Sequence, residues 1–159
     1  MRHHPIFPPA LQTRALGFTL IELLVTISIA AVLAAIAAPS FSSFIAGQRI
    51  KTASYDISYA LTYARSEAIK RNADVVLAPA SGGWQNGWTA SVGGTILEQH
   101  DALTDMAVTG PAPSLTYNSN GRLKADVTPF AISSTSTSAA PRCVSINLSG
   151  LPNSKTGVC

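Results

Sequence analysis

The longest feature in the hydrophobic pattern is an apolar run near the amino terminus. From Phe18 to Ala38 the chain has 21 residues with a single charge, Glu22. At about 1.5 Å per residue, a helix of this length spans about 31 Å, close to the roughly 30 Å hydrocarbon core of a bilayer. Length therefore favours a membrane-crossing helix over residues 18–38 and disfavours a buried core helix.

An amphipathic helical pattern follows over residues 39–72. Small and apolar residues recur at three- and four-residue intervals, which predicts a face that packs on a sheet. This face comprises Ala53, Ile57, Ala60, Leu61, Ala64 and Ala68. The opposite face is interpreted as solvated, and it carries Arg49, Lys51, Asp56, Arg65, Glu67, Lys70 and Arg71. Glu67 and Arg71 have the i,i+4 spacing of a helical ion pair, and Asn72 is the predicted helix stop.

Residues 73–159 alternate short apolar runs with turn signals such as Gly82-Gly83, Gly93-Gly94 and Asn120-Gly121. This pattern predicts an antiparallel sheet, so the fold class is α+β: a long N-terminal helix packed on a β-rich head. Strands are expected near residues 75–78, 87–92, 95–99, 114–118, 128–133 and 143–148. In the last of these, Val144, Ile146 and Leu148 alternate toward the core. The low-complexity run over residues 133–140 is expected to be an exposed loop.

Two tryptophans, Trp84 and Trp88, flank Gly87 in the first part of the head. Large rings around a glycine turn suit a structural role, because they cover a small core and the glycine permits an unusual backbone. A ligand-binding aromatic pair is the alternative.

The two cysteines, Cys143 and Cys159, both lie in the C-terminal region. A small head has a narrow margin of stability, and outside the cytoplasm a cysteine pair without further ligands nearby forms a disulfide more often than a metal site. We therefore expect a bridge between Cys143 and Cys159, and no metal or other cofactor.

Residues 1–17 precede the apolar run and contain Arg2 and Arg14. Positive charge on this side keeps the segment cytoplasmic, which places the head outside the cytoplasm. An ordinary secretory signal ending near Ala35-Ile36-Ala37 and a plain membrane anchor are the alternatives. The signal alternative requires a shorter apolar stretch than this one.

Glu22 does not fit a plain anchor. A carboxylate inside a membrane segment costs on the order of 2.5 to 3.5 kcal/mol, so its place near the start of the apolar run indicates a task.

The stretch from Gly17 to Val25, with the sequence GFTLIELLV, resembles the cleavage and methylation signal of type IV prepilins and type II secretion pseudopilins. The resemblance implies that a prepilin peptidase cuts between Gly17 and Phe18 and methylates the new amine of Phe18. It also implies that Glu22 pairs with the amine of a neighbouring subunit in the filament core, where an unpaired charge is costly. Pro39 matches the position at which this family bends the helix.

Three further stretches resemble the GspH/FimT family of pseudopilins and minor pilins: residues 64–72, 84–88 and 115–122. With the N-terminal signal they distribute the resemblance over most of the chain. The resemblance implies an inner-membrane protein with a single span and a periplasmic head, which primes assembly of a type IV pilus or a type II secretion pseudopilus. Its partners would be other pilins. The pilus and the secretion system are both left open.

Catalysis is not expected. After residue 17 the chain has one histidine, His100, and it contains no nucleophile elbow, metal-ligand cluster or phosphate loop. His100 beside Asp101 is interpreted as an exposed loop pair.

DNA uptake is the alternative function, because some FimT-type proteins bind DNA through an arginine-bearing C-terminal tail. Here that position has Gly150-Leu151-Pro152-Asn153, and removal of residues 1–17 leaves nine basic and eight acidic residues. Several cations must neutralise phosphates together for strong binding. The candidate contacts are Arg122, Lys124, Arg142 and Lys155, and weak, salt-sensitive binding is expected.

Overall fold

The computed structural model describes residues 17–159. These residues form a long helix, a short 3₁₀ helix (η1) and eight strands, in two compact units with a boundary between Ala38 and Pro39. The elements are α1 (Leu20–Arg71), β1 (Val75–Pro79), η1 (Trp84–Asn86), β2 (Trp88–Val92), β3 (Thr95–His100), β4 (Met106–Thr109), β5 (Leu115–Tyr117), β6 (Phe130–Ser134), β7 (Arg142–Ile146) and β8 (Pro152–Thr156).

The first unit contains the apolar part of α1. Its described side chains, residues 17–37, are all exposed, including Phe18 at 82% and Ile36 at 70%. The helix is long and apolar enough here to cross a membrane, judged by length and composition. Of the expected leader, residues 1–16 lie outside the described residues. Pro39 lies within α1, and the bend expected there stays a prediction.

Helix α1 ends at the expected residue. Asn72 has a positive φ of 49°, a left-handed conformation that asparagine tolerates and that commonly terminates helices. The amide of Ala73 then donates to the carbonyl of Ala68 at 3.2 Å, which satisfies one of the carbonyls left free at the helix end.

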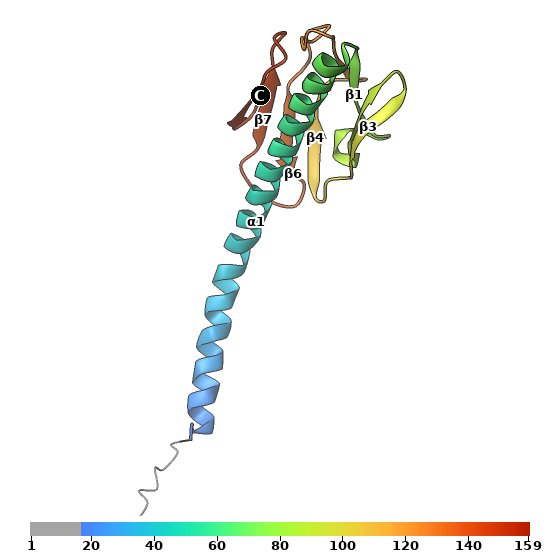
Figure 1. Ribbon diagram of the computed structural model, residues 1–159. Helices are drawn as coiled ribbons and strands as arrows, with labels where there is room; N and C mark the ends of the chain where they lie inside the picture. Colours follow the sequence, from blue (N-terminus) through green and yellow to red (C-terminus); the bar gives the residue numbers. More distant parts are fainter. Residues whose placement is uncertain (1–16) are drawn as a thin grey trace, which may run out of the picture. The chain divides into compact units, whose positions relative to one another are not determined.

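The second unit is built on the inner face of α1. The six residues expected on this face are confirmed as buried, with at most 1% of each exposed. Ser54 is buried beside them, and Ala46 and Ile50 extend the face toward the N-terminus. Strands of the head lie along this part of the helix (Figure 1). Because most of these side chains are alanines, the strands can approach the helix backbone closely.

The head contains two four-stranded antiparallel sheets where the sequence predicted one. Their strand orders are β3-β2-β1-β5 and β4-β6-β7-β8. All six predicted strands are present within a few residues, whereas β4 and β8 were not predicted. β4 has only four residues, and the sequence of β8, PNSKT, is polar. β8 forms a strand because it pairs with β7 over five positions.

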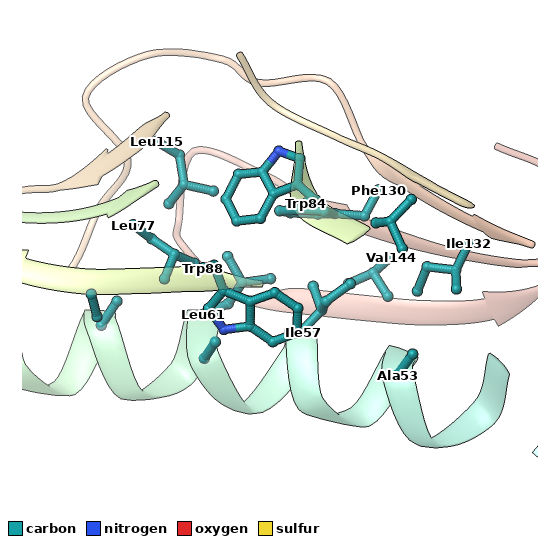
Figure 2. Packing of buried hydrophobic residues seen from close by; sticks show 14 of the residues in the cluster. Ala53, Ile57, Leu61, Leu77, Trp84, Trp88, Leu115, Phe130, Ile132 and Val144 are labelled. Carbon is teal, nitrogen blue, oxygen red and sulfur yellow. The ribbon is translucent and has the colours of Figure 1, made fainter. Parts of the chain in front are cut away.

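The core between the helix and the sheets contains both tryptophans, which confirms their structural role. Figure 2 shows Ile57 and Leu61 of α1 pointing toward Trp88, and Trp84 lying near Phe130. The rings of Trp84 and Phe130 meet edge to face with centroids 4.7 Å apart, and Nε1 of Trp84 donates to the carbonyl of Pro111 at 2.9 Å. Gly87, with a φ of 101°, ends η1, and a Cβ added there would lie too close to the carbonyl oxygen of His100, so a larger residue would clash.

The alternation predicted for the last apolar strand is wrong at its end. Val144 is fully buried and Ile146 is half-buried, but Leu148 is 41% exposed because β7 ends at Ile146 and Leu148 lies in the following turn. The low-complexity segment is a loop from Thr135 onward, and its first two residues, Ser133 and Ser134, belong to β6.

A disulfide joins Cys143 to Cys159, as the cysteine pattern predicted. Cys143 lies in the middle of β7 and is 2% exposed, and Cys159 is the last residue of the sequence. The bridge therefore ties the segment after β8 back to the sheet.

Reduction of this disulfide should lower the free energy of unfolding by about 3 kcal/mol, because the bridge closes a loop of 16 residues that is otherwise free in the unfolded chain. Denaturant unfolding with and without a reducing agent measures the difference. The matched control is Cys143→Ser/Cys159→Ser, which should unfold like the reduced protein and ignore the reductant. Equal stability of the oxidised and reduced forms would contradict the prediction.

Candidate functional site

The start of α1 contains a reciprocal hydrogen-bonding pair that positions Glu22. The amide of Glu22 donates to Oγ1 of Thr19 at 3.2 Å, and the amide of Thr19 approaches Oε2 of Glu22 at 3.5 Å. This arrangement is a capping box, in which two side chains satisfy backbone amides that the first helical turn leaves free. The signal T-x-x-E is present in the sequence, but the role of Thr19 was not predicted.

The capping box places the carboxylate of Glu22 at the positive end of the helix dipole. Its neighbours on the helix are apolar and exposed, among them Leu20 at 77%, Ile21 at 70% and Leu23 at 58%. The only carboxylate of the apolar segment thus accepts from the amide of Thr19, which directly follows the residue whose amine is released if the chain is cut after Gly17.

The bond between Gly17 and Phe18 lies just before the helix. Both residues are exposed and have no regular secondary structure. An exposed peptide bond outside the helix suits a peptidase, since no helix has to unfold before the cut.

At the other end of α1, the helix meets two turns of the head around Gly121. Nε of Arg65 donates to the carbonyl of Gly121 at 3.0 Å, and Gly150 lies against the same carbonyl. The hydroxyl of Tyr117 donates to the carbonyl of Gly150 at 3.2 Å, and burial raises the pKa of Tyr117 to about 12. The segments 64–72 and 115–122 therefore contact each other and the turn that precedes β8.

The prediction that the outer face of α1 is solvated is wrong at Glu67. Its side chain is 10% exposed, and its carboxylate accepts from Nε of Arg71 at 2.6 Å and from Nζ of Lys70 at 3.3 Å. The hydrogen bond from Arg71, helped by Lys70, holds the pKa of Glu67 below its ordinary value. The predicted i,i+4 pair is confirmed, but it lies at the edge of the core.

The four candidate DNA contacts do not form one surface. Arg142 and Cys143 are neighbours in β7, and Lys155 is paired with Cys143, so Arg142 and Lys155 point to opposite faces of the sheet. Nη2 of Arg142 also donates to Oγ of Ser154 at 3.2 Å. Lys124 forms an ion pair with Asp74, whereas Arg122 is exposed.

The sequence suggested that His100 belongs to an exposed loop pair, and the structure contradicts this. His100 is the last residue of β3, and its ring stacks on that of Trp88 with centroids 4.1 Å apart and planes 13° from parallel. Its Nε2 lies 3.7 Å from Oδ2 of Asp56 on α1. These contacts dock β3 on the helix. Within residues 17–159 no group of three or more metal-ligating side chains is present.

Comparisons with known proteins agree with this geometry. The family model for the type II transport protein GspH matches residues 54–150, and the model for the prokaryotic N-terminal methylation motif matches residues 13–38. The comparison with curated proteins gave no match.

The solved structures that resemble this chain include two crystal forms of the type IV minor pilin FimU from Pseudomonas aeruginosa strain PAO1. One is 22% identical with a TM-score of 0.60, covering 68% of this chain and 89% of that chain. The other is 24% identical with a TM-score of 0.57, covering 66% and 91%. At this identity the likeness establishes the fold alone.

The long helix, the antiparallel head and the methylation motif define a type IV pilin-like protein. Because the GspH model covers more than half of the sequence, the chain belongs to the GspH family of pseudopilins and minor pilins. Its methylation motif implies processing by a prepilin peptidase and pilin partners in a filament, and its apolar helix indicates membrane anchoring.

Proposed function

We propose that this protein is a minor pilin or pseudopilin that primes assembly of a type IV pilus or a type II secretion pseudopilus. Before assembly it would be a single-pass protein of the inner membrane with a periplasmic head. Residues 1–17 would be its cleaved leader, residues 18–38 its filament-core helix, residues 39–72 the continuation of the helix and residues 73–159 the head. Its role would be structural and would require no cofactor.

The observation that carries this proposal is the placement of Glu22. Its carboxylate is held at the first turn of an apolar helix whose side chains are all exposed up to Ala37. Such a helix needs apolar neighbours, and a charge among them needs a partner of opposite sign. The amine of Phe18 on an adjacent subunit supplies that partner, and it keeps its positive charge after methylation.

The first prediction concerns processing. The mature chain should begin at Phe18, carry an N-methyl group and contain 142 of the 159 residues, because the cut removes residues 1–17. Intact-mass measurement of the protein from membranes and filaments tests this. Gly17→Glu should leave the precursor uncut, since a side chain replaces the hydrogen next to the scissile bond. Assembled protein that retains Met1, or that begins after Ala38, would show that the proposed processing is wrong.

The second prediction concerns Glu22. Glu22→Ala should insert into the membrane at least as well as the wild type, because the charge that it removes costs on the order of 2.5 to 3.5 kcal/mol to insert. The variant should nevertheless enter filaments poorly. Fractionation of cells into membranes and sheared filaments measures both steps. Thr19→Val is the matched control, because it removes one half of the capping box and keeps the carboxylate. If Glu22→Ala enters filaments at the wild-type level, charge pairing does not drive assembly.

DNA binding is the second candidate function, and the arrangement of charges disfavours it. Arg142 and Lys155 point to opposite faces of their sheet, and Lys124 is paired with Asp74. Arg122 and Lys155 are exposed, and neither forms an ion pair among the described residues.

The mature chain in detergent should therefore bind duplex DNA weakly, with an affinity that falls steeply as salt is raised, because the four candidate contacts do not lie on one surface and cannot neutralise adjacent phosphates together. A fluorescence titration at physiological salt measures the affinity. Low-micromolar or tighter binding that is lost in Arg142→Ala/Lys155→Ala, but not in the matched control Arg49→Ala, would make DNA capture the main function.

A further inference from the structure

The head has two exposed surfaces that are opposite in shape and in charge. The first, which we call the cationic knob, surrounds Ile69 at the C-terminal end of α1. The second, which we call the acidic hollow, lies between an earlier stretch of the same helix and the loop that joins β3 to β4. Both surfaces lie within the unit that begins at Pro39.

The cationic knob has an apolar centre with a positive rim. Ile69 is 51% exposed, although it lies against Gly121 and beside the side chain of Arg65. Leu148 and Leu151, which flank the turn at Gly150, are 41% and 55% exposed. The rim consists of Arg65, Lys70, Arg71, Arg122 and Lys124.

The carboxylates of this region neutralise only part of that charge. Glu67 is shared between Lys70 and Arg71, and Asp74 pairs with Lys124. Arg65 donates to a backbone carbonyl, which carries no full charge. Five cations therefore face two carboxylates, and a net positive charge remains around Ile69.

The acidic hollow has an apolar lining with a negative rim. Its volume is about 460 Å³, and its lining includes Phe44, Ile45, Leu103 and Met106. Asp56 is part of the wall, and Asp101 and Asp105 adjoin the lining residues of the loop.

The positive groups of this region neutralise only part of the negative charge of the rim. Arg49 pairs with Asp105 at 2.7 Å, so one of the three carboxylates is neutralised. Nε2 of His100 lies 3.7 Å from Oδ2 of Asp56. The hollow therefore accepts an apolar side chain that is accompanied by cations.

We propose that the cationic knob of one copy inserts Ile69 into the acidic hollow of a second copy, so that heads associate head to tail. This inference rests on the proposed function, since the contact would be made between subunits of a filament. An apolar centre with a charged rim is the composition of a protein interface. Opposite charges on the two rims fix the orientation of the partners and exclude the reversed pairing.

The positions of the two surfaces along α1 set the displacement expected if the helices of the two copies are parallel. Ile69 and Thr52, which lines the hollow, are seventeen positions apart on α1, which corresponds to about 25 Å along the helix axis. A contact between two different patches is heterologous, so it joins neighbouring copies in the same orientation and does not form a symmetric dimer. A polyanion bound to the knob is the competing occupant, but it leaves the apolar hollow without a role.

The test uses the mature full-length protein in detergent with the photo-cross-linking residue p-benzoylphenylalanine in place of Ile69. Irradiation should give a covalent dimer, and mass spectrometry should map the partner peptide to residues 44–56 or 101–106. The matched control carries the same residue in place of Val158, which is 77% exposed and belongs to neither surface. A dimer yield no higher than in the control, or a cross-link that maps elsewhere, would overturn the proposal.

Charge reversal provides a second measurement. Arg122→Glu and Asp101→Lys should each lower the cross-linking yield about two- to five-fold, and the double variant should restore it, because the swapped charges again attract. Neither side chain makes a hydrogen bond or ion pair within residues 17–159, so folding should be unaffected. The control Lys155→Glu changes a charge outside both surfaces and should leave the yield unchanged. A double variant no better than the single ones would count against the contact.

The two proposals fail separately in this design. Glu22→Ala leaves the head unaltered, so it should cross-link through Ile69 in detergent even when it does not enter filaments. Conversely, Arg122→Glu could lose the cross-link and still enter filaments at the wild-type level. That result would refute the head-to-tail contact as a requirement for assembly and leave the proposed function intact.

Discussion

The packing of two sheets on one face of α1 is the constraint on which the head depends. The sheets share no strand, so the hydrogen-bond ladders of one do not stabilise the other. They are joined by the buried face from Ala46 to Ala68 and by the edge-to-face contact of Trp84 with Phe130. A larger residue at Ala53, Ala60 or Ala64 would displace the strands that pack on this face, because close-packed interiors have little space for added methylene groups.

The sequence was most informative where a periodic pattern extends over many residues. The inner face of α1 follows from its spacing alone, and Asn72 marks the helix end because its side chain tolerates a left-handed backbone. The strands β4 and β8 were missed for a different reason. A sequence such as PNSKT becomes a strand only when β7 supplies hydrogen bonds beside it, and that neighbour is set by the topology of the whole head.

The candidate sites show the same limit. Glu22 could be found because a lone carboxylate in an apolar run is conspicuous, and Cys143 and Cys159 because they are the only two cysteines. Glu67 was misplaced since helical spacing does not say how far the sheet edge reaches around the helix. The candidate DNA contacts could be judged only after strand register placed Arg142 and Lys155 on opposite faces. The knob around Ile69 was also out of reach, because three distant segments create it.

The position of β8 at the edge of its sheet bears on how such a protein can polymerise. An exposed edge offers free amides and carbonyls to any other strand, which is a common route to aggregation. Here the edge begins with Pro152, which lacks an amide hydrogen, and carries the charge of Lys155, while the disulfide at Cys159 holds the following segment in place. A subunit that meets others at high local concentration is thus protected against strand addition at this edge. A filament held together by its helices would not compete there with amyloid-like pairing.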